Sequence, residues 1–350
     1  MKSTKVNIIY IFMIAIQLFI GCSRENNMIS QGNKELELGN YESAINNYNE
    51  AIKINSKNAK IYFNRGVAWF NMGKNDNAIK DYNKALEIDK NFIEAYINRG
   101  FALNKKGHYD LSIYDYTKAL QLNPNDSLKV IIYFNRGLPF SNIGDYKSAI
   151  DDYTKVIQSD SDNSEAYYFR AKAWYEENEC DKAINDYTKA IQINPVNVQA
   201  ISNRAYTWYE NRNYDSAIID YEKVLELDPQ NANAYNNYSW LLSTCPDDKY
   251  RDGVKALELS MKAIELYPDE ALFLETKAAA HAELGNFKEA VQIEKKAILL
   301  IEEGNIKLKE DFAAKLESYK SGKPWREYVK REDWMLKYKV KSEKVGEEGN

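Results

Sequence analysis

Apolar and small residues return along this chain with a fixed period, which is the spacing from Gly32 to Gly66 and again from Gly66 to Gly100. In residues 59–92, Ala78, Tyr82, Ala85 and Leu86 are spaced by four, three and one. This spacing is typical of the apolar stripe of a helix. Gly73 before the stripe predicts the end of a preceding helix. A period of this length indicates stacked copies of one supersecondary unit, here two helices joined by a turn.

The pattern resembles the tetratricopeptide repeat, which has a small residue at the eighth place, alanine at the twentieth and an aromatic residue at the twenty-fourth. The resemblance implies an all-α fold, a right-handed superhelical solenoid of helix–turn–helix repeats. About eight copies occupy residues 25–304, and the seventh is stretched by an insertion. The copies are 25–58, 59–92, 93–126, 130–163, 164–197, 198–231, 232–270 and 271–304. We expect a capping helix over 305–320 and a loosely ordered, charged and aromatic tail over 321–350.

Residues 1–21 have the features of a secretion signal. Lys2 and Lys5 precede an apolar run that is shorter than the ~20 residues of a spanning helix. The exit of this run resembles a bacterial lipobox, which implies cleavage after residue 21, lipidation of Cys22 and a short tether over 22–28. An uncleaved anchor helix is the alternative. Both predict a protein of the cell envelope held on a membrane, and Ser23 after the cysteine favours the outer membrane or cell surface.

Five copies carry an arginine that is followed at a constant spacing by an aspartate, and the other copies lack both. Charges that occur together predict an ion pair between the two helices of a copy. The alternative is an arginine ladder that binds an acidic ligand, but an unpaired, partly buried charge is costly. The predicted structural pairs are Arg65 with Asp81, Arg99 with Asp115, Arg136 with Asp152, Arg170 with Asp186, and Arg204 with Asp220.

In the tetratricopeptide family the first helices of successive copies line a concave groove. Carried onto this chain, the family's groove positions hold mainly aromatic and apolar residues, which mark interaction sites when they are exposed. Packing against a neighbouring helix is the alternative for each of them. The groove candidates are Phe63, Val67, Phe70, Ile97, Phe101, Phe134, Leu138, Tyr168, Tyr175, Tyr206, Tyr209 and Trp240.

Composition narrows the class of function. The 47 lysines and arginines against 52 acidic residues leave a formal net charge of -5, which disfavours binding to nucleic acid. The 3 cysteines and 2 histidines are too scattered for a metal site. Because nucleophile motifs and phosphate-binding loops are also lacking, we expect no catalytic residue, metal or cofactor, and no enzyme.

These observations favour a membrane-anchored scaffold or adaptor. Its groove would bind a peptide or helix of another envelope protein. Because the chain contains 27 tyrosines, a lipoprotein that binds glycan or peptidoglycan through its tyrosine-rich surface is the alternative.

Overall fold

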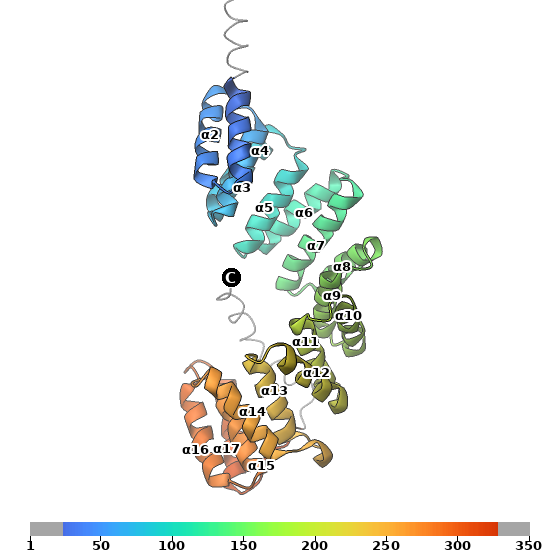
Figure 1. The fold of residues 1–350 in the computed structure, drawn as a ribbon, viewed down its shortest axis with the longest axis vertical. Helices are drawn as coiled ribbons and strands as arrows, with labels where there is room; N and C mark the ends of the chain where they lie inside the picture. Colours follow the sequence, from blue (N-terminus) through green and yellow to red (C-terminus); the bar gives the residue numbers. More distant parts are fainter. Residues whose placement is uncertain (1–23, 328–350) are drawn as a thin grey trace, which may run out of the picture. The chain divides into compact units, whose positions relative to one another are not determined.

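The computed structural model describes residues 24–327, which form helices and connecting turns without a strand (Figure 1). The chain divides into a first unit that ends at Ala173 and a second that begins at Trp174, so the boundary lies inside one helix. The all-helical fold that the sequence predicts is confirmed. No helix within these residues is both long and apolar enough to span a bilayer.

The first unit is a stack of helix pairs in which each helix packs mainly on its neighbours in sequence. Its elements are a helix over residues 24–37, α2 (Tyr41–Ile54), α3 (Ala59–Asn71), α4 (Asn75–Ile88), α5 (Ile93–Lys105), α6 (Tyr109–Gln121), α7 (Asp126–Asn142), α8 (Tyr146–Ser159) and most of α9 (Ser164–Glu176). The three residues inserted before the fourth copy lengthen α7 at its N-terminal end, which Asn125 caps by accepting from the amide of Leu128.

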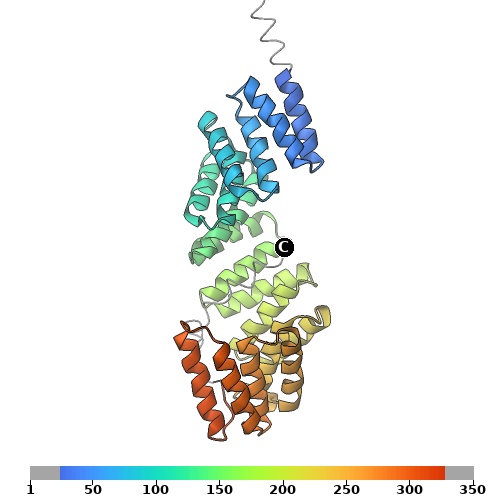
Figure 2. The same cartoon turned by 90° about the vertical axis from the view of Figure 1, so that its left-hand side faces the viewer.

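The second unit continues with the same kind of helix pair, and its helices lie side by side in both views (Figure 1, Figure 2). Its elements are the end of α9, α10 (Cys180–Ile193), α11 (Val198–Glu210), α12 (Tyr214–Leu227), α13 (Ala232–Thr244), the 3₁₀ helix η1 (Asp248–Tyr250), α14 (Gly253–Leu266), α15 (Ala271–Glu283), α16 (Phe287–Leu300) and α17 (Ile306–Lys320). The insertion of the seventh copy forms η1 and its flanking turns. Helix α17 lies where the capping helix is expected, and it buries Leu308, Phe312 and Leu316.

The tyrosine at the twenty-fourth place of a copy fills the centre of its helix pair. Six such rings are at most 2% exposed: Tyr48, Tyr82, Tyr116, Tyr153, Tyr187 and Tyr221. The small residue at the eighth place makes room for the ring. A Cβ added to Gly66 would lie 2.6 Å from Cε1 of Tyr82, and one added to Gly137 would lie equally close to Tyr153. The regular spacing of glycine and tyrosine in the sequence therefore reflects a close approach of each tyrosine ring to the backbone of the glycine in the same copy.

Four of the predicted arginine–aspartate pairs are present, and each is bidentate. Nε and Nη2 of Arg65 donate to the two oxygens of Asp81 at 2.7 and 2.6 Å. The same geometry joins Arg99 to Asp115, Arg136 to Asp152, and Arg204 to Asp220. The members of the fifth pair, Arg170 and Asp186, belong to different units, and that pair stays a prediction.

The remaining guanidinium nitrogen of each arginine bonds to the twenty-fifth place of the preceding copy. Nη1 of Arg65 donates to Oδ1 of Asn49 at 2.6 Å, and Nη1 of Arg99 donates to Asn83 at the same distance. Threonine hydroxyls accept in the later copies: Thr117 from Arg136, Thr154 from Arg170, and Thr188 from Arg204. These arginines therefore connect successive copies and are not offered to a ligand.

The seventh copy replaces this connection with a tyrosine. Tyr238 stands at the arginine's place and donates its hydroxyl to Oε1 of Glu222, the twenty-fifth residue of the preceding copy, at 2.9 Å. Nζ of Lys255 lies 2.8 Å from the same hydroxyl and 3.0 Å from the same carboxylate. The connection between copies is thus kept although the arginine and aspartate are both lost.

The first helix begins at residue 24, one residue before the start of the predicted first copy. Residues 25–28, predicted both as tether and as part of this copy, belong to the helix. Glu25 fixes this turn, because its Oε1 accepts from the side-chain amides of Asn55 and Asn58 at 3.0 and 2.9 Å. The predicted signal sequence 1–21 and Cys22 lie outside the described residues.

Candidate functional site

The fifth-place candidates of the first unit support the stack instead of lining a groove. The ring of Phe63 lies 4.8 Å from Phe92 and 5.9 Å from Tyr82 between centroids. Ile97 is only 9% exposed. The fifth place lies one turn before the eighth, so it faces the same buried tyrosine. These observations favour the alternative, packing against neighbours, for Phe63 and Ile97, and their groove assignment stays a prediction.

Two further fifth-place candidates also contact the aromatic core. The ring of Phe134 lies 6.0 Å from Tyr153 and 5.7 Å from Phe169. Tyr168 is half-buried, with its ring 5.1 Å from that of Phe169. For Phe134, as for Phe63, these contacts favour packing against neighbours, and the groove assignment stays a prediction.

The ninth- and twelfth-place candidates of the first unit remain partly exposed. We call this set, Val67, Phe70, Phe101 and Leu138, the first-unit patch. The rings of Phe70 and Phe101 meet edge to face at 5.4 Å, and Nζ of Lys105 lies 5.9 Å from the centroid of Phe101. The lysine therefore already covers part of the face of the Phe101 ring.

A larger aromatic surface lies in the second unit. Five partly exposed tyrosines follow one another there, with successive centroid distances of 6.2, 6.3, 6.0 and 5.2 Å. We call this set the tyrosine ladder: Tyr175, Tyr206, Tyr209, Tyr214 and Tyr250. The first three were groove candidates. Tyr214 and Tyr250 were missed, since one begins a second helix and the other lies in the insertion.

Carboxylates hold three of the five hydroxyls of the ladder. Tyr175 donates to Oε2 of Glu210 at 2.6 Å, and Tyr206 donates to Oε1 of the same residue at 3.0 Å. Tyr250 donates to Oδ2 of Asp215 at 2.7 Å. Burial, followed by the charge of Glu210, raises the pKa of Tyr206 well above its usual value. At neutral pH the hydroxyl of Tyr206 is therefore a protonated donor. The bonds to carboxylates fix the rings of Tyr175, Tyr206 and Tyr250 before any partner binds.

Trp240, the last groove candidate, is covered by the chain's own C-terminal residues. Nζ of Lys315 lies 4.9 Å from the centroid of Trp240, 5.4 Å from that of Phe312 and 5.8 Å from that of Trp325. Because α17 and the residues after it supply this lysine and Trp325, the face of Trp240 is already occupied. These contacts disfavour the groove assignment of Trp240, which stays a prediction.

A buried charge cluster lies between α15, α16 and α17, formed by Glu275, Glu294, Asp311 and Lys315. The side chain of Lys315 is 2% exposed and pairs with Glu275 and with Oδ2 of Asp311, the latter at 2.6 Å. Glu294 is fully buried, and neither of its carboxyl oxygens has a hydrogen-bond partner within residues 24–327. One lysine thus faces three carboxyl groups, and sequence spacing gave no sign of this cluster.

Burial sets the protonation of the cluster. Desolvation, reinforced by the charge of Glu275, raises the pKa of Glu294 to about 9, so this carboxyl is protonated at neutral pH. Desolvation also raises the pKa of Glu275 to about 7 against the opposing charge of Lys315. For Lys315, burial acts to lower the pKa, but the two carboxylates outweigh it and raise the pKa overall. With no exposed member, the cluster serves stability and not chemistry on a substrate.

Residues 323–327, which we call the C-terminal strap, are packed on the second unit. Trp325 contacts the apolar cluster of Ala278, Ala282, Ala290 and Tyr319. Beyond it, the amide of Glu327 donates to the carbonyl of Thr244 at 3.0 Å. The last carbonyls of α13 need such donors, and the indole buries a large apolar area. The expectation of a loose tail over 321–350 is therefore wrong for the strap, and 328–350 lie outside the described residues.

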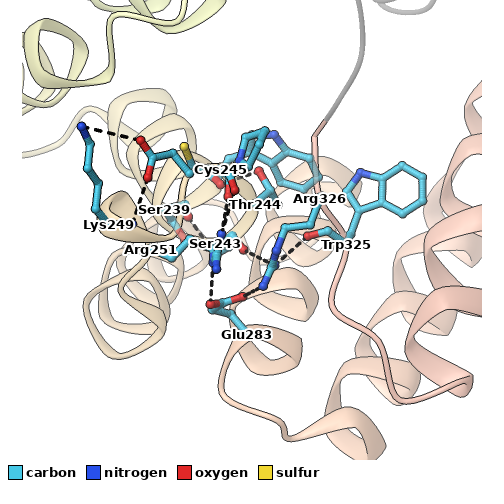
Figure 3. Close-up of polar contacts among 12 residues, drawn as sticks. Ser239, Ser243, Thr244, Cys245, Lys249, Arg251, Glu283, Trp325 and Arg326 are labelled. Atoms are coloured by element: carbon cyan, nitrogen blue, oxygen red, sulfur yellow. Dashed lines mark hydrogen bonds and ion pairs between the residues drawn. The ribbon is translucent and has the colours of Figure 1, made fainter.

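Glu283 joins the strap to the insertion of the seventh copy (Figure 3). In the strap, Nη2 of Arg326 lies 2.6 Å from Oε2 of Glu283. Nη1 of the same arginine donates to the carbonyl of Ser243 at 3.3 Å. From the insertion, Nε of Arg251 donates to Oε1 of Glu283 at 3.0 Å. Arg251 also donates to the carbonyls of Cys245 and Pro246 at 2.9 and 3.2 Å. One carboxylate between two arginines thus fixes both segments at the C-terminal ends of α13 and α15.

Comparison with known families decides what kind of protein this is. Models described as TPR repeat or tetratricopeptide repeat match residues 32–73, 59–92, 93–126, 134–197, 198–231 and 220–253, which together extend over more than half of the chain. The chain is a tetratricopeptide-repeat protein. No curated protein matches it.

Solved structures similar to this tetratricopeptide-repeat protein agree on the fold. The C-terminal part of a TPR repeat-containing protein from Cytophaga hutchinsonii is 21% identical, with a TM-score of 0.59, covering 71% of this chain and 98% of that chain. A tetratricopeptide repeat protein from Parabacteroides merdae is 16% identical, with a TM-score of 0.55 and coverages of 75% and 98%. For pilF of Pseudomonas aeruginosa the identity is 19%, the TM-score 0.52 and the coverages 62% and 97%. At these identities the likeness concerns the fold alone.

The tetratricopeptide repeat is a protein-interaction fold. Proteins of the family are typically non-catalytic scaffolds. Within residues 24–327, no group of three or more histidine, cysteine, aspartate or glutamate side chains could hold a metal ion. The ladder presents partly exposed tyrosine rings, and the carboxylates of Glu210 and Asp215 lie next to them.

Proposed function

We propose that this protein is a scaffold that binds an extended or helical segment of another protein through its tyrosine ladder. The observation that carries the proposal is the network in which Glu210 holds the hydroxyls of Tyr175 and Tyr206. Tyrosine supplies large contact area with few rotatable bonds. Rings that are fixed in advance lose little further entropy on binding, so more of the contact energy appears as affinity.

The other candidate surfaces are covered to a greater extent by the protein's own side chains than the tyrosine ladder is. The fifth-place aromatics are engaged in the core, and Trp240 is covered by Lys315. The first-unit patch is smaller and lies partly beneath Lys105. We therefore place the main contact on the second unit.

Alanine at Tyr175 and Tyr209 is expected to weaken capture of the partner at least tenfold, because buried aromatic contacts contribute about 2 kcal/mol or more at interface centres. The partner is first identified by photo-crosslinking in intact cells, and its affinity for each purified variant is then measured. The matched control carries alanine at Phe70 and Phe101, and circular dichroism checks the helical content of both variants.

Undiminished capture by the ladder variant with its helices intact would exclude the ladder as the binding surface. Loss of capture in the control alone would move the site to the first-unit patch. Sedimentation of the purified wild-type protein with peptidoglycan, in the absence of any protein, would instead favour the glycan-binding alternative.

The proposal includes an envelope location with a lipid anchor on Cys22, and a partner that is itself an envelope protein. Its support is the basic start, the apolar run and the glycine before Cys22. Each buried acyl methylene contributes ~0.8 kcal/mol, so two or more chains hold a protein firmly on a bilayer.

Replacement Cys22→Ser is expected to prevent lipidation and to remove the mature protein from the membrane fraction. Cell fractionation and the intact mass of the purified wild-type chain measure this. A mass that includes residues 1–21 without acyl chains, together with a Cys22→Ser variant that stays on the membrane, would instead establish the uncleaved anchor helix.

A further inference from the structure

The C-terminal strap runs across the helix ends of the second unit in a definite order. It leaves α17, places Trp325 against α15 and α16, and brings Arg326 to Glu283 at the end of α15. It then reaches the end of α13, where the amide of Glu327 bonds to Thr244. The strap therefore passes from the eighth copy to the seventh.

The next copy in this order, the sixth, carries Tyr206, Tyr209 and Tyr214 of the ladder. Tyr209 lies in the last turn of α11, and Glu327 is close enough to affect it: burial first, and then the charge of Glu327, raises the pKa of Tyr209 well above its usual value. The described chain thus ends close to Tyr209 of the ladder.

The sequence that follows has the composition to continue along this surface. Residues 328–341 contain Tyr328, Trp334 and Tyr338, and five basic residues against two acidic ones. The basic residues are Lys330, Arg331, Lys337, Lys339 and Lys341, and the acidic ones are Glu332 and Asp333. On the ladder, Tyr175 and Tyr206 donate to the carboxylate of Glu210, and Tyr250 donates to that of Asp215. Aromatic rings and basic side chains suit tyrosine faces edged with carboxylates.

The length of this segment is more than sufficient. The ladder rings from Tyr209 to Tyr175 are separated by two steps of 6.3 and 6.2 Å. An extended chain spans ~3.3 Å per residue, so four or five residues cover that distance. Attachment through Glu327 also makes the docking intramolecular, with an effective concentration in the millimolar range.

We propose that residues 328–341 dock in cis on the tyrosine ladder, so that the chain's own basic and aromatic segment occupies the surface until a partner displaces it. The docking itself follows from the position and direction of the strap. Only the competition with a partner rests on the proposed function.

The test uses the full-length protein with a photoreactive benzoylphenylalanine in place of Trp334. Irradiation of the purified monomer is expected to give an intramolecular crosslink that peptide mass spectrometry maps to residues 206–214 or to Tyr175. In the background Tyr206→Ala with Tyr209→Ala, the yield of this crosslink is expected to fall at least fivefold. The same photoprobe placed at Val345, outside the proposed segment, is the matched control and is expected to give less than a fifth of the yield.

Several outcomes would overturn the docking. They are crosslinks that map to the first unit, crosslinks that join two copies of the chain, and the absence of any crosslink from position 334. Crosslinks that form only to lipid when phosphatidylglycerol vesicles are added would assign the segment to an anionic membrane surface and would equally overturn the proposal. Because no partner is present, failure here is separate from failure of the proposed function, which the capture measurements decide.

Discussion

Replacement Lys315→Met is expected to destabilise the second unit by about 3–5 kcal/mol, the usual result of removing one member of a buried ion pair. The methionine would fill most of the space against Trp240, Phe312 and Trp325. It would leave Glu275 and Asp311 without their common cation in a site that is 5% exposed or less at each carboxylate side chain. Their mutual repulsion and desolvation would then be uncompensated, so protonation of one carboxyl would accompany the loss of stability.

Amide hydrogen exchange of α15, α16 and α17 measures this loss locally, which matters because repeat arrays need not unfold in one step. The control is Lys320→Met on the same helix, whose lysine pairs at the surface with Glu317. Surface pairs contribute about 0–1 kcal/mol, so this variant should behave like the wild type. Equal exchange in the Lys315 and Lys320 variants would contradict a stabilising role for the buried charge cluster.

Replacement Glu294→Gln is expected to remove much of a pH dependence of stability that the wild-type protein shows between about pH 5 and pH 8. The native protein keeps a proton on Glu294 up to a pKa of about 9, whereas the unfolded chain loses it near the usual value of 4.5. The native state therefore binds more protons in this window, and stability falls as the pH rises. Glu294 by itself contributes a slope of at most about 1.4 kcal/mol per pH unit, or at most about 4 kcal/mol over three pH units.

Glutamine cannot titrate, so the variant should resemble the wild type at pH 5 and be more stable at pH 8. Denaturant unfolding at both pH values measures the difference. The raised pKa of Glu275, about 7, leaves a smaller residual slope between pH 5 and pH 7 in the variant. Glu289→Gln, an exposed substitution on the same helix, is the control and should keep the full slope. A Glu294 variant with an unchanged slope would show that this carboxyl is already ionised in the native state.

Periodic features of the fold could be predicted from the sequence because each copy repeats the same local contacts. Gly66 and Tyr82 stand at the same spacing in the chain as Gly137 and Tyr153, so one close approach leaves a regular signal. The pairing of Arg65 with Asp81 was visible for the same reason, since both charges appear and disappear together along the array.

The candidate site was predicted less well, because groove and core candidates about two turns apart share one face of the same helix. Phe63 and Phe70 are both aromatic residues of α3, yet the first packs against Tyr82 and the second lies in the first-unit patch. Contacts made once in the chain leave no periodic signal at all. Lys315 meets Glu275 across 40 residues, and Arg326 meets Ser243 across 83. The buried charge cluster and the C-terminal strap therefore required the structure.

The arginine connections between copies have a consequence for how such an array can change in length. Each donor lies in one copy and its acceptor at a fixed place in the copy before it, as with Arg99 and Asn83. Loss of residues 59–92 from the gene would bring Arg99 against Asn49, which offers the same amide oxygen that it gives to Arg65. The new junction would therefore satisfy the guanidinium as fully as the old one. Duplication or deletion of an inner copy would keep the hydrogen bonds between neighbouring copies. Such arrays can therefore become longer or shorter by whole copies during evolution.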